Sequence, residues 1–327
     1  MEYTPADDTF GRKVSLDYHT SFPFQGLQTE VRCNSPEVIK WVNGYFGIWN
    51  SLADEHINTE TKLTVNIILH RDDHTNSKNI PFVYRAYGDY FLGANGSNLY
   101  MVDIDKGLGL CFITPELASE REKFSYEILL SILRVLVTGF DRGPIHAGAV
   151  VFNNRPLLFI GKSGIGKSTL CYACVRQGFG LLTDEVAFVS IKNGLRIWSG
   201  SHYIRLCPES VKYFPELANI SPRIQVSGKL KFVIDAKILG TEKIYLGADK
   251  PIVFVLQRHN QDNSLLKPIS SEVLINALYE SIEPGFDLNR QLDEVIQALA
   301  NVGKYGLIVG NDPNEVIASL KNLIYSG

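Results

Sequence analysis

Residues 157–189, LLFIGKSGIGKSTLCYACVRQGFGLLTDEVAFV, decide the fold of this 327-residue chain. The stretch opens with an apolar run at 157–160, which is typical of a buried strand. GKSGIGKS at 161–168 follows and matches the pattern G-x-x-x-x-G-K-[S/T] in full. Residues 169–177 favour a helix, and Gly178 favours its end. This order of strand, glycine-rich loop and helix predicts a phosphate-binding loop.

The predicted loop offers several contacts to a nucleoside triphosphate. Its glycines let successive backbone N–H groups turn toward one anion, and the helix N-terminus adds its positive end. Lys167 is expected to reach the β- and γ-phosphates, and the Ser168 hydroxyl to ligate Mg²⁺. The residues expected to bind the nucleotide are Gly161, Ser163, Gly164, Ile165, Gly166, Lys167, Ser168 and Thr169. The alternative is a chance glycine-rich turn before a helix.

Two acids, Asp184 and Glu185, stand between apolar runs. Adjacent carboxylates in such a setting are costly unless they face a cation or a reactive site. Phosphoryl transfer needs a phosphate cradle, a metal and a group that takes the acceptor's proton. Asp184 is the best-placed acid for the last role, but it can equally hold only Mg²⁺ through water, and the sequence leaves both roles open. On an extended segment, Glu185 would point to the opposite side.

Composition and charge exclude several classes of protein. The chain is 45% hydrophobic and 20% charged with a net charge of −3, which is typical of a globular protein and lacks the basic excess of nucleic-acid binders. Its five scattered cysteines fit a reducing compartment better than a disulfide framework. MEYTPADDTF at the start is not a signal peptide, and no apolar run is long enough to span a bilayer. We expect a cytoplasmic protein that binds neither nucleic acid nor membrane.

The remaining pattern predicts two α/β domains. Residues 1–115 indicate a smaller, mostly antiparallel α+β domain, with a hairpin turned at Gly88-Asp89. Residues 115–139 change to helical spacing and predict one long packing helix that enters the second domain, 116–327. A second hairpin, turned at 153–155, is expected to lead into the phosphate loop, unlike the parallel βαβ unit of most P-loop NTPases. Four basic residues in or after later strands are weaker phosphate-binding candidates, and solvated charges are at least as good an interpretation: Arg205, Lys229, Lys231 and Arg258.

Several of these motifs resemble the catalytic domain of HPr kinase/phosphorylase. They are IHAG at 145–148, GIGKS at 164–168, RQGF at 176–179 and TDE at 183–185. The resemblance is strong over residues 143–190 and extends to the rest only in layout. It implies a fold shared with phosphoenolpyruvate carboxykinases, and transfer of the γ-phosphoryl group of ATP to a serine hydroxyl.

The same resemblance implies roles for three residues by their position. Asp184 matches the acid that deprotonates the acceptor serine, which makes it the general base. His146 matches the family histidine beside the transferred phosphate, whereas taken without the family it would be a structural residue. Glu185 stands where the family has a second Asp, which implies a share in binding Mg²⁺. Asp184, His146 and Lys167 are thus the expected catalytic residues, and Ser168, Asp184 and Glu185 the expected metal ligands.

The chain also departs from that family. It lacks the E-[I/V]-R-G-L-G-like signature associated with the reverse phosphorolysis, and residues 1–115 do not resemble the family's N-terminal domain. Both features argue against dephosphorylation and against HPr as substrate. The layout is more similar to the HPr kinase-related proteins of peptide natural-product clusters, notably lasso peptide kinases. That resemblance implies a peptide or protein substrate bearing a serine, recognised with the help of the N-terminal domain, and HPr kinases suggest a homo-oligomer.

Two further functions stay open from the sequence. One is a nucleotide-dependent switch or hydrolase without a phosphoryl acceptor, in which Asp184 orients only metal and water. The other is a kinase for a small alcohol such as free serine.

Overall fold

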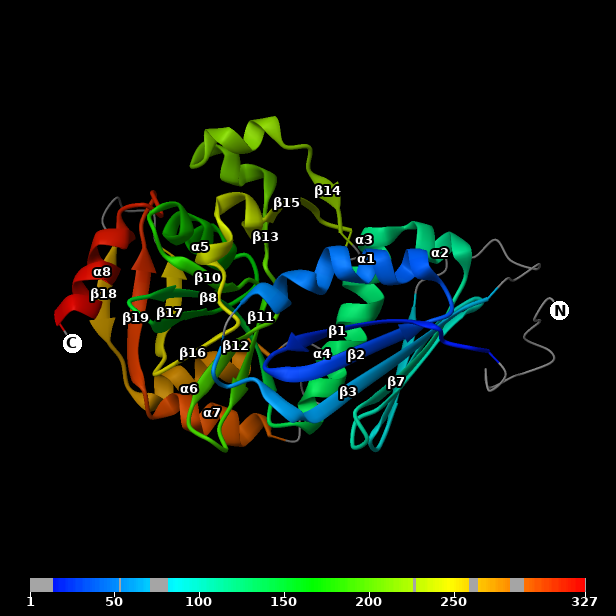
Figure 1. Ribbon diagram of the computed structural model, residues 1–327. Coiled ribbons are helices and arrows are strands. Elements are labelled where there is room, and N and C mark those ends of the chain that lie inside the picture. The colour runs from blue at the N-terminus through cyan, green and yellow to red at the C-terminus, as the bar shows by residue number, and fades with distance from the viewer. Residues whose placement is uncertain are drawn as a thin grey trace. The chain divides into compact units, whose positions relative to one another are not determined.

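The computed structural model describes residues 14–52, 54–70, 82–225, 228–258, 264–282 and 291–326 (Figure 1). Its contacts divide the chain into two compact units, Met1–Phe140 and Asp141–Gly327. Each unit combines sheets with helices, which confirms the mixed α/β class. Among the described residues, none of the helices combines the length and apolar content needed to cross a membrane.

The first unit is built on a seven-stranded sheet of order β1-β2-β3-β7-β6-β5-β4. Its strands are β1 (Tyr18–Phe24), β2 (Leu27–Cys33), β3 (Asn58–Leu69), β4 (Val83–Tyr87), β5 (Tyr90–Asn95), β6 (Asn98–Asp103) and β7 (Leu108–Ile113). The pairs β2–β3 and β3–β7 are parallel, and the other four pairs are antiparallel. The expected hairpin at Gly88-Asp89 is confirmed, since β4 and β5 pair on either side of it.

Helices pack on one face of this sheet. They are α1 (Pro36–Phe46), η2 (Gly47–Ser51), α2 (Pro115–Ser119), α3 (Arg121–Lys123), the π-helical η4 (Phe124–Leu129), α4 (Leu130–Leu136) and η5 (Val137–Gly139). The prediction of one unbroken helix over 115–139 is wrong, because Glu120 (ψ 63°) leaves the helical region between α2 and α3.

The segment 116–140 lies in the first unit, so the observed division differs from the predicted boundary after residue 115. Packing explains the difference. The apolar side of α4, including Ile132 and Leu136, is buried, and a Cβ added at Gly109 of β7 would lie 2.9 Å from Cγ2 of Ile132. A helix in such close contact with a strand of the first sheet belongs to that sheet's core.

The second unit contains a nine-stranded sheet of order β16-β12-β11-β8-β9-β17-β19-β18, with β10 also paired to β8, and a small sheet β13-β15-β14. The strands of the large sheet are β8 (Gly143–Phe152), β9 (Arg155–Ile160), β10 (Gly180–Thr183), β11 (Val186–Ser190), β12 (Arg196–Ser199), β16 (Gly247–Asp249), β17 (Ile252–Arg258), β18 (Leu265–Pro268) and β19 (Gly303–Val309). Those of the small sheet are β13 (Tyr203–Leu206), β14 (Arg223–Ile224) and β15 (Leu230–Asp235).

The predicted hairpin before the loop is present. Strands β8 and β9 are antiparallel, and their turn has positive φ at both Asn153 (49°) and Asn154 (59°), as a two-residue type I′ turn requires. Strand β9 then runs parallel to β17, and β17 parallel to β19. The carboxyl end of β9 therefore opens at the edge of a parallel region, where α/β sheets commonly bind ligands.

Helices cover both faces of this sheet. The helices of the second unit are α5 (Lys167–Arg176), η6 (Pro208–Lys212), η7 (Pro215–Asn219), η8 (Ala236–Leu239), η9 (Thr241–Lys243), α6 (Ser271–Glu280), α7 (Leu292–Ala300) and α8 (Val316–Ser326). Every second residue of β8, among them Ile145 and Ala147, is buried in one core with side chains of α6 and α7. The opposite face of β8 meets α5, because a Cβ added at Gly148 would lie 2.6 Å from Sγ of Cys171. The loop helix therefore packs directly on β8.

Candidate active site

The glycine-rich loop joins β9 to α5 in a conformation that few other sequences allow. Gly161, Gly164 and Gly166 have φ of 143°, 83° and 114°, a region that side chains with a Cβ avoid. Residues 162–164 are exposed, so the loop lies at the surface. Of the residues predicted to bind nucleotide, Gly161, Ser163, Gly164, Ile165 and Gly166 lie in the loop, and Lys167, Ser168 and Thr169 form the first turn of α5.

The N-terminus of α5 has the features of an anion-binding end. Among the described residues no side chain caps it, so the first N–H groups of the helix stay available. Lys167 is only 7% exposed, and its Nζ donates to the carbonyl oxygens of Gly161 (2.6 Å) and Lys162 (3.3 Å). The loop backbone thus holds one positive charge at its centre, where a phosphate would lie.

Asp184 and Glu185 interrupt a strand that is otherwise regular. Strands β10 and β11 both run antiparallel to β8, with Thr183 opposite Ala149 and Val186 opposite His146. Glu185 has φ 75°, and the Val186 N–H donates to the Asp184 carbonyl at 3.1 Å, the pattern of a γ-turn. We call residues 183–186 the carboxylate turn. The condition of an extended segment, under which Glu185 would point to the opposite side, is therefore not met, and such a turn is rare and strained.

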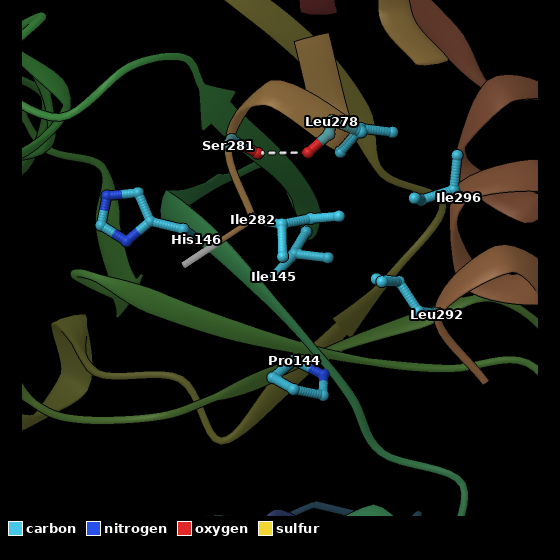
Figure 2. A pocket seen from close by; sticks show the side chains of 8 residues that line it. All are labelled: Pro144, Ile145, His146, Leu278, Ser281, Ile282, Leu292 and Ile296. Carbon is cyan, nitrogen blue, oxygen red and sulfur yellow. Dashed lines mark hydrogen bonds between the residues drawn. The ribbon is translucent and has the colours of Figure 1, made fainter. Parts of the chain in front are cut away.

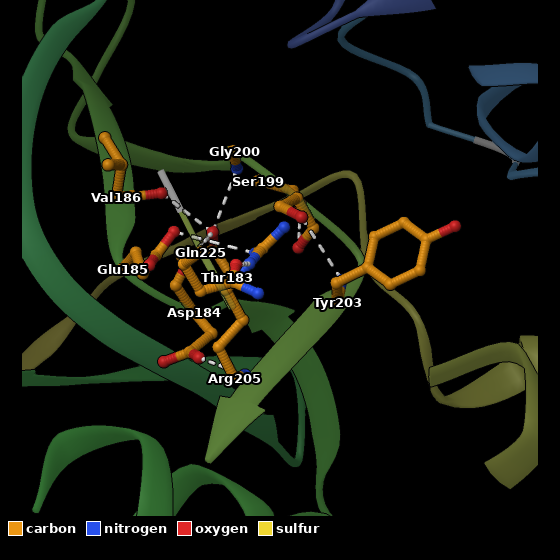
Figure 3. Close-up of polar contacts among 10 residues, drawn as sticks. Thr183, Asp184, Glu185, Val186, Ser199, Gly200, Tyr203, Arg205 and Gln225 are labelled. Atoms are coloured by element: carbon orange, nitrogen blue, oxygen red, sulfur yellow. Dashed lines mark hydrogen bonds and ion pairs between the residues drawn. The ribbon is translucent and has the colours of Figure 1, made fainter. Parts of the chain in front are cut away.

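Thr183 holds the carboxylate turn closed (Figure 3). Its Oγ1 donates to the Val186 carbonyl (2.7 Å) and accepts from the Gly200 N–H (3.1 Å). A Cβ at Gly200 would lie 2.4 Å from the Val186 oxygen, so this approach requires glycine. No role was predicted for either residue, because the contact joins positions 17 residues apart and no local pattern marks it.

Asp184 is fully buried beside the first turn of α5. Its Oδ2 accepts a hydrogen bond from the Arg205 backbone N–H at 2.9 Å. Its Oδ1 is buried without a hydrogen-bond partner among the described residues. Burial, and then the charge of Glu185, raise the pKa of Asp184 to about 6, against the smaller lowering effects of the Arg205 N–H and the Ser168 hydroxyl. The site therefore holds an incompletely bonded carboxylate close to Ser168.

Arg205 on β13 connects the two acids. Its backbone N–H bonds to Asp184, and its guanidinium Nη1 lies 3.6 Å from Oε2 of Glu185 (Figure 3). The Nε of the same buried side chain donates to Oε1 of Gln225 at 3.2 Å. Arg205 was predicted as a candidate phosphate ligand, but in the structure it contacts the two acids. The guanidinium of Arg258, another of those candidates, donates to the hydroxyl of Tyr213 (3.0 Å).

His146 of β8 lies on the same face of the strand as Gly148, the face that meets α5. Figure 2 shows its ring directed away from Ile145 and Leu292, with which it lines a small apolar pocket. Burial, and then the charge of Lys167, lower the pKa of His146 to about 4, while Glu185 acts in the opposite direction. The imidazole is therefore neutral at pH 7. Strand β8, the start of α5 and the carboxylate turn thus bring all the predicted catalytic residues together.

The donor set fits a metal ion shared with phosphates. The described residues contain no group of three or more His, Cys, Asp or Glu side chains that could hold a metal by themselves. Mg²⁺ in nucleotide sites, however, is bound by only one or two protein oxygens together with phosphate and water. The unpartnered Oδ1 of Asp184 and the nearby Ser168 hydroxyl supply oxygens of this kind.

Comparison with solved structures shows a distant likeness. No protein-family profile and no curated protein matches the chain. Among solved structures it is similar to the Hpr(Ser) kinase/phosphatase from Coxiella burnetii, with 16% identity and a TM-score of 0.31 over 56% of this chain and 99% of that chain. This is a distant structural relationship only.

Proposed function

We propose that this protein is a kinase that transfers the γ-phosphoryl group of ATP, bound with Mg²⁺, to a serine hydroxyl. The observation that carries the proposal is the position of Asp184. Its buried carboxylate, with one oxygen unpartnered among the described residues, lies beside the first turn of a helix that follows a phosphate-binding loop. A buried carboxylate at this place can supply the base that phosphoryl transfer to a hydroxyl needs, whereas a hydrolase or switch would use it only to orient metal and water.

The glycine-rich loop binds the phosphates. The N–H groups of residues 162–168 and the Lys167 ammonium are the donors for the β- and γ-phosphates. Ser168 and an acid of the carboxylate turn would hold Mg²⁺, which neutralises phosphate charge when bound. The Lys167 ammonium group already lies within the loop, bonded to loop carbonyl oxygens, so it needs no large movement to contact a phosphate.

Asp184 takes the proton of the acceptor. As the serine Oγ forms its bond to the γ-phosphorus, the bond from that phosphorus to the bridging β-oxygen breaks, ADP leaves, and the hydroxyl proton moves to an Asp184 oxygen. A base is most effective when its pKa lies near the working pH, and the pKa of about 6 is closer to neutrality than that of an ordinary Asp. Arg205 fixes the carboxylate through its N–H, and the neutral His146 can hydrogen-bond near the phosphates.

The acceptor class rests on sequence resemblance. The motifs within residues 143–190 support a serine of a peptide or protein, and the whole layout supports a precursor peptide of the lasso type. The same resemblance supports the proposals of a fold shared with HPr kinases and phosphoenolpyruvate carboxykinases and of a homo-oligomer. The scattered cysteines support the proposal of a cytoplasmic location.

The test is an incubation of the protein with ATP and Mg²⁺ and a panel of acceptors, followed by intact mass measurement. The panel contains a peptide ending in serine, HPr and free serine. We expect one added phosphate on the peptide, lost in Asp184→Asn by about 10²–10⁴-fold in rate while ATP affinity is retained. Asp105→Asn, which changes an exposed carboxylate of the β6–β7 turn, is the matched control and keeps full activity.

Each other outcome has a definite meaning. ADP formation without any phosphorylated acceptor would replace the kinase by a hydrolase or switch. Transfer to free serine alone would keep the mechanism and exclude the peptide. Absence of ATP binding would overturn the proposal altogether.

A further inference from the structure

Strand β4 ends the sheet of the first unit, and it is exposed along its whole length. All five of its residues are exposed, with Val83 at 54% and Tyr87 at 64%. At the other edge of the sheet, β1 buries its last three residues. An open edge strand offers a row of unpaired backbone groups to another chain. Among the described residues, β5 alone pairs with β4.

The register of the hairpin identifies the backbone groups that face this edge. Tyr87 and Tyr90 are the paired residues on either side of the two-residue turn. The pair that closes such a turn is hydrogen-bonded, and bonded and non-bonded pairs alternate along the strands. Tyr87, Arg85 and Val83 therefore bond to β5, and the N–H and C=O groups of Tyr84 and Ala86 face outward.

The face of the sheet next to this edge is apolar. The cross-strand register places Val83, Arg85 and Tyr87 on one face with residues of β5, β6 and β7. The exposed apolar residues of that face, which we call the apolar half-face, are Val83, Tyr87, Tyr90, Leu99, Met101 and Leu108. On β1–β3 the same face carries polar residues instead, including His19, Ser21, Gln28, Glu30, Arg32, Lys62 and Thr64. Apolar surface gathered beside an open strand marks an interaction site.

Charge decides between a second copy and a different partner. Two copies of β4 could pair as antiparallel strands through their outward residues, Tyr84 and Ala86. The two-fold axis of this pairing passes at Arg85, so the arginine of one copy lies opposite the same arginine of the other. Like charges directly opposite each other destabilise a strand pair. Among the described residues, the Arg85 guanidinium contacts only the Tyr84 carbonyl oxygen (2.9 Å), with no carboxylate in reach. The edge therefore favours a strand that brings an acidic side chain to this position.

We propose that the β4 edge binds an extended peptide segment as an added strand, with an acidic side chain opposite Arg85. Apolar side chains two residues to either side of the acid would pack on Val83 and Tyr87 of the apolar half-face. Backbone hydrogen bonds to the Ala86 N–H and C=O groups and to the Tyr84 N–H supply affinity, since the Tyr84 carbonyl oxygen already accepts from Arg85. The alternate side chains supply specificity. Binding at this edge needs no phosphoryl transfer, so it stands or fails independently of the kinase chemistry.

The test uses two labelled, blocked peptides, Thr-Thr-Val-Thr-Glu-Thr-Val-Thr-Thr and its counterpart with lysine in place of glutamate. Neither contains serine, and fluorescence anisotropy with the full chain is measured without nucleotide. The glutamate peptide is expected to bind about tenfold more tightly than the lysine peptide. Arg85→Glu, a change at an exposed side chain, is expected to reverse this order.

A backbone variant tests strand addition itself. Ala86→Pro removes an outward N–H without a hydrogen bond to β5, which an edge strand tolerates. This variant is expected to lower the affinity for the glutamate peptide about tenfold or more, whereas Ala86→Ser is expected to bind it as the wild type does. No binding of either peptide by the wild type, or an unchanged preference in Arg85→Glu, overturns the proposal. A dimer in solution that Ala86→Pro dissociates would assign the edge to a second copy instead.

Discussion

The phosphate loop and the carboxylate turn meet in one site, but different parts of the chain hold each in place. The loop is local: Lys167 bonds to carbonyls five and six residues before it, and three glycines supply the φ values. The turn depends on distant positions, since Thr183 needs the Gly200 N–H and Asp184 needs that of Arg205, 21 residues away. A local arrangement is visible in the sequence, whereas a distant one appears only in the fold.

The two regions also differ in how much their residues lower the stability of the folded protein. In the loop, positive φ falls on glycines, which adopt it readily. In the turn it falls on Glu185, a residue with a Cβ, and the neighbouring carboxylate of Asp184 is fully buried. Strain and desolvation of this kind gather at functional sites, where geometry matters more than stability.

The largest expected effect is on Asp184. Its pKa is raised in the folded state from 3.8 to about 6, so folding favours the protonated form. The stability that this group contributes is therefore complete below about pH 4 and is lost as the pH rises through 6, by about 3 kcal/mol in total. Asp184→Asn removes the buried charge, and we expect it to raise the free energy of unfolding at pH 7 by about that amount.

Urea unfolding at pH 4, 5, 6 and 7 measures this effect. The wild type is expected to lose stability across this range relative to Asp184→Asn, while Asp105→Asn follows the wild type. Parallel pH profiles for wild type and Asp184→Asn would show that the carboxylate is not desolvated in the folded protein.

The second effect is on Thr183. Thr183→Val keeps the shape of the side chain but leaves the Gly200 N–H and the Val186 carbonyl without the hydroxyl. Unsatisfied buried groups cost about 1–3 kcal/mol, and we expect a loss of this size in urea unfolding. Thr183→Ser keeps the hydroxyl and is expected to restore most of it. The carboxylate turn positions Asp184 but does not position the phosphate loop. Turnover of Thr183→Val should therefore fall while its ATP affinity stays unchanged. An equal loss of turnover and ATP affinity would mean that the loop and the turn form one structural unit.

The sequence predicted the elements whose determinants are local. Hairpins at Gly88-Asp89 and Asn153-Asn154, and the strand, loop and helix around Gly166, all follow from turn residues and alternation within a few positions. The positive φ of Glu185 could not be predicted, because its partners come from another strand.

For residues 116–140, the sequence did not show to which of the two compact units the segment belongs. Their helical spacing was visible, but spacing cannot tell which sheet a helix packs on. In the fold, the absence of a side chain at Gly109 leaves room for Ile132 against the first sheet. Nor does helical spacing reveal the break at Glu120 or the π-helical turn that follows.

The smallest expected change in the free energy of unfolding is at Gly164 of the phosphate loop, where only the local backbone is affected. Gly164 has φ 83° and open space where a Cβ would stand, so Gly164→Ala strains only its own backbone, by about 1 kcal/mol. Gly44 of α1 also has open space around it but an ordinary helical backbone, so Gly44→Ala should stabilise by about 0.5–1 kcal/mol. The same methyl group then acts with opposite sign at the two positions. Urea unfolding of both variants measures the difference, and a loss at Gly164 much larger than about 1 kcal/mol would mean that the loop, like the carboxylate turn, is held by distant contacts.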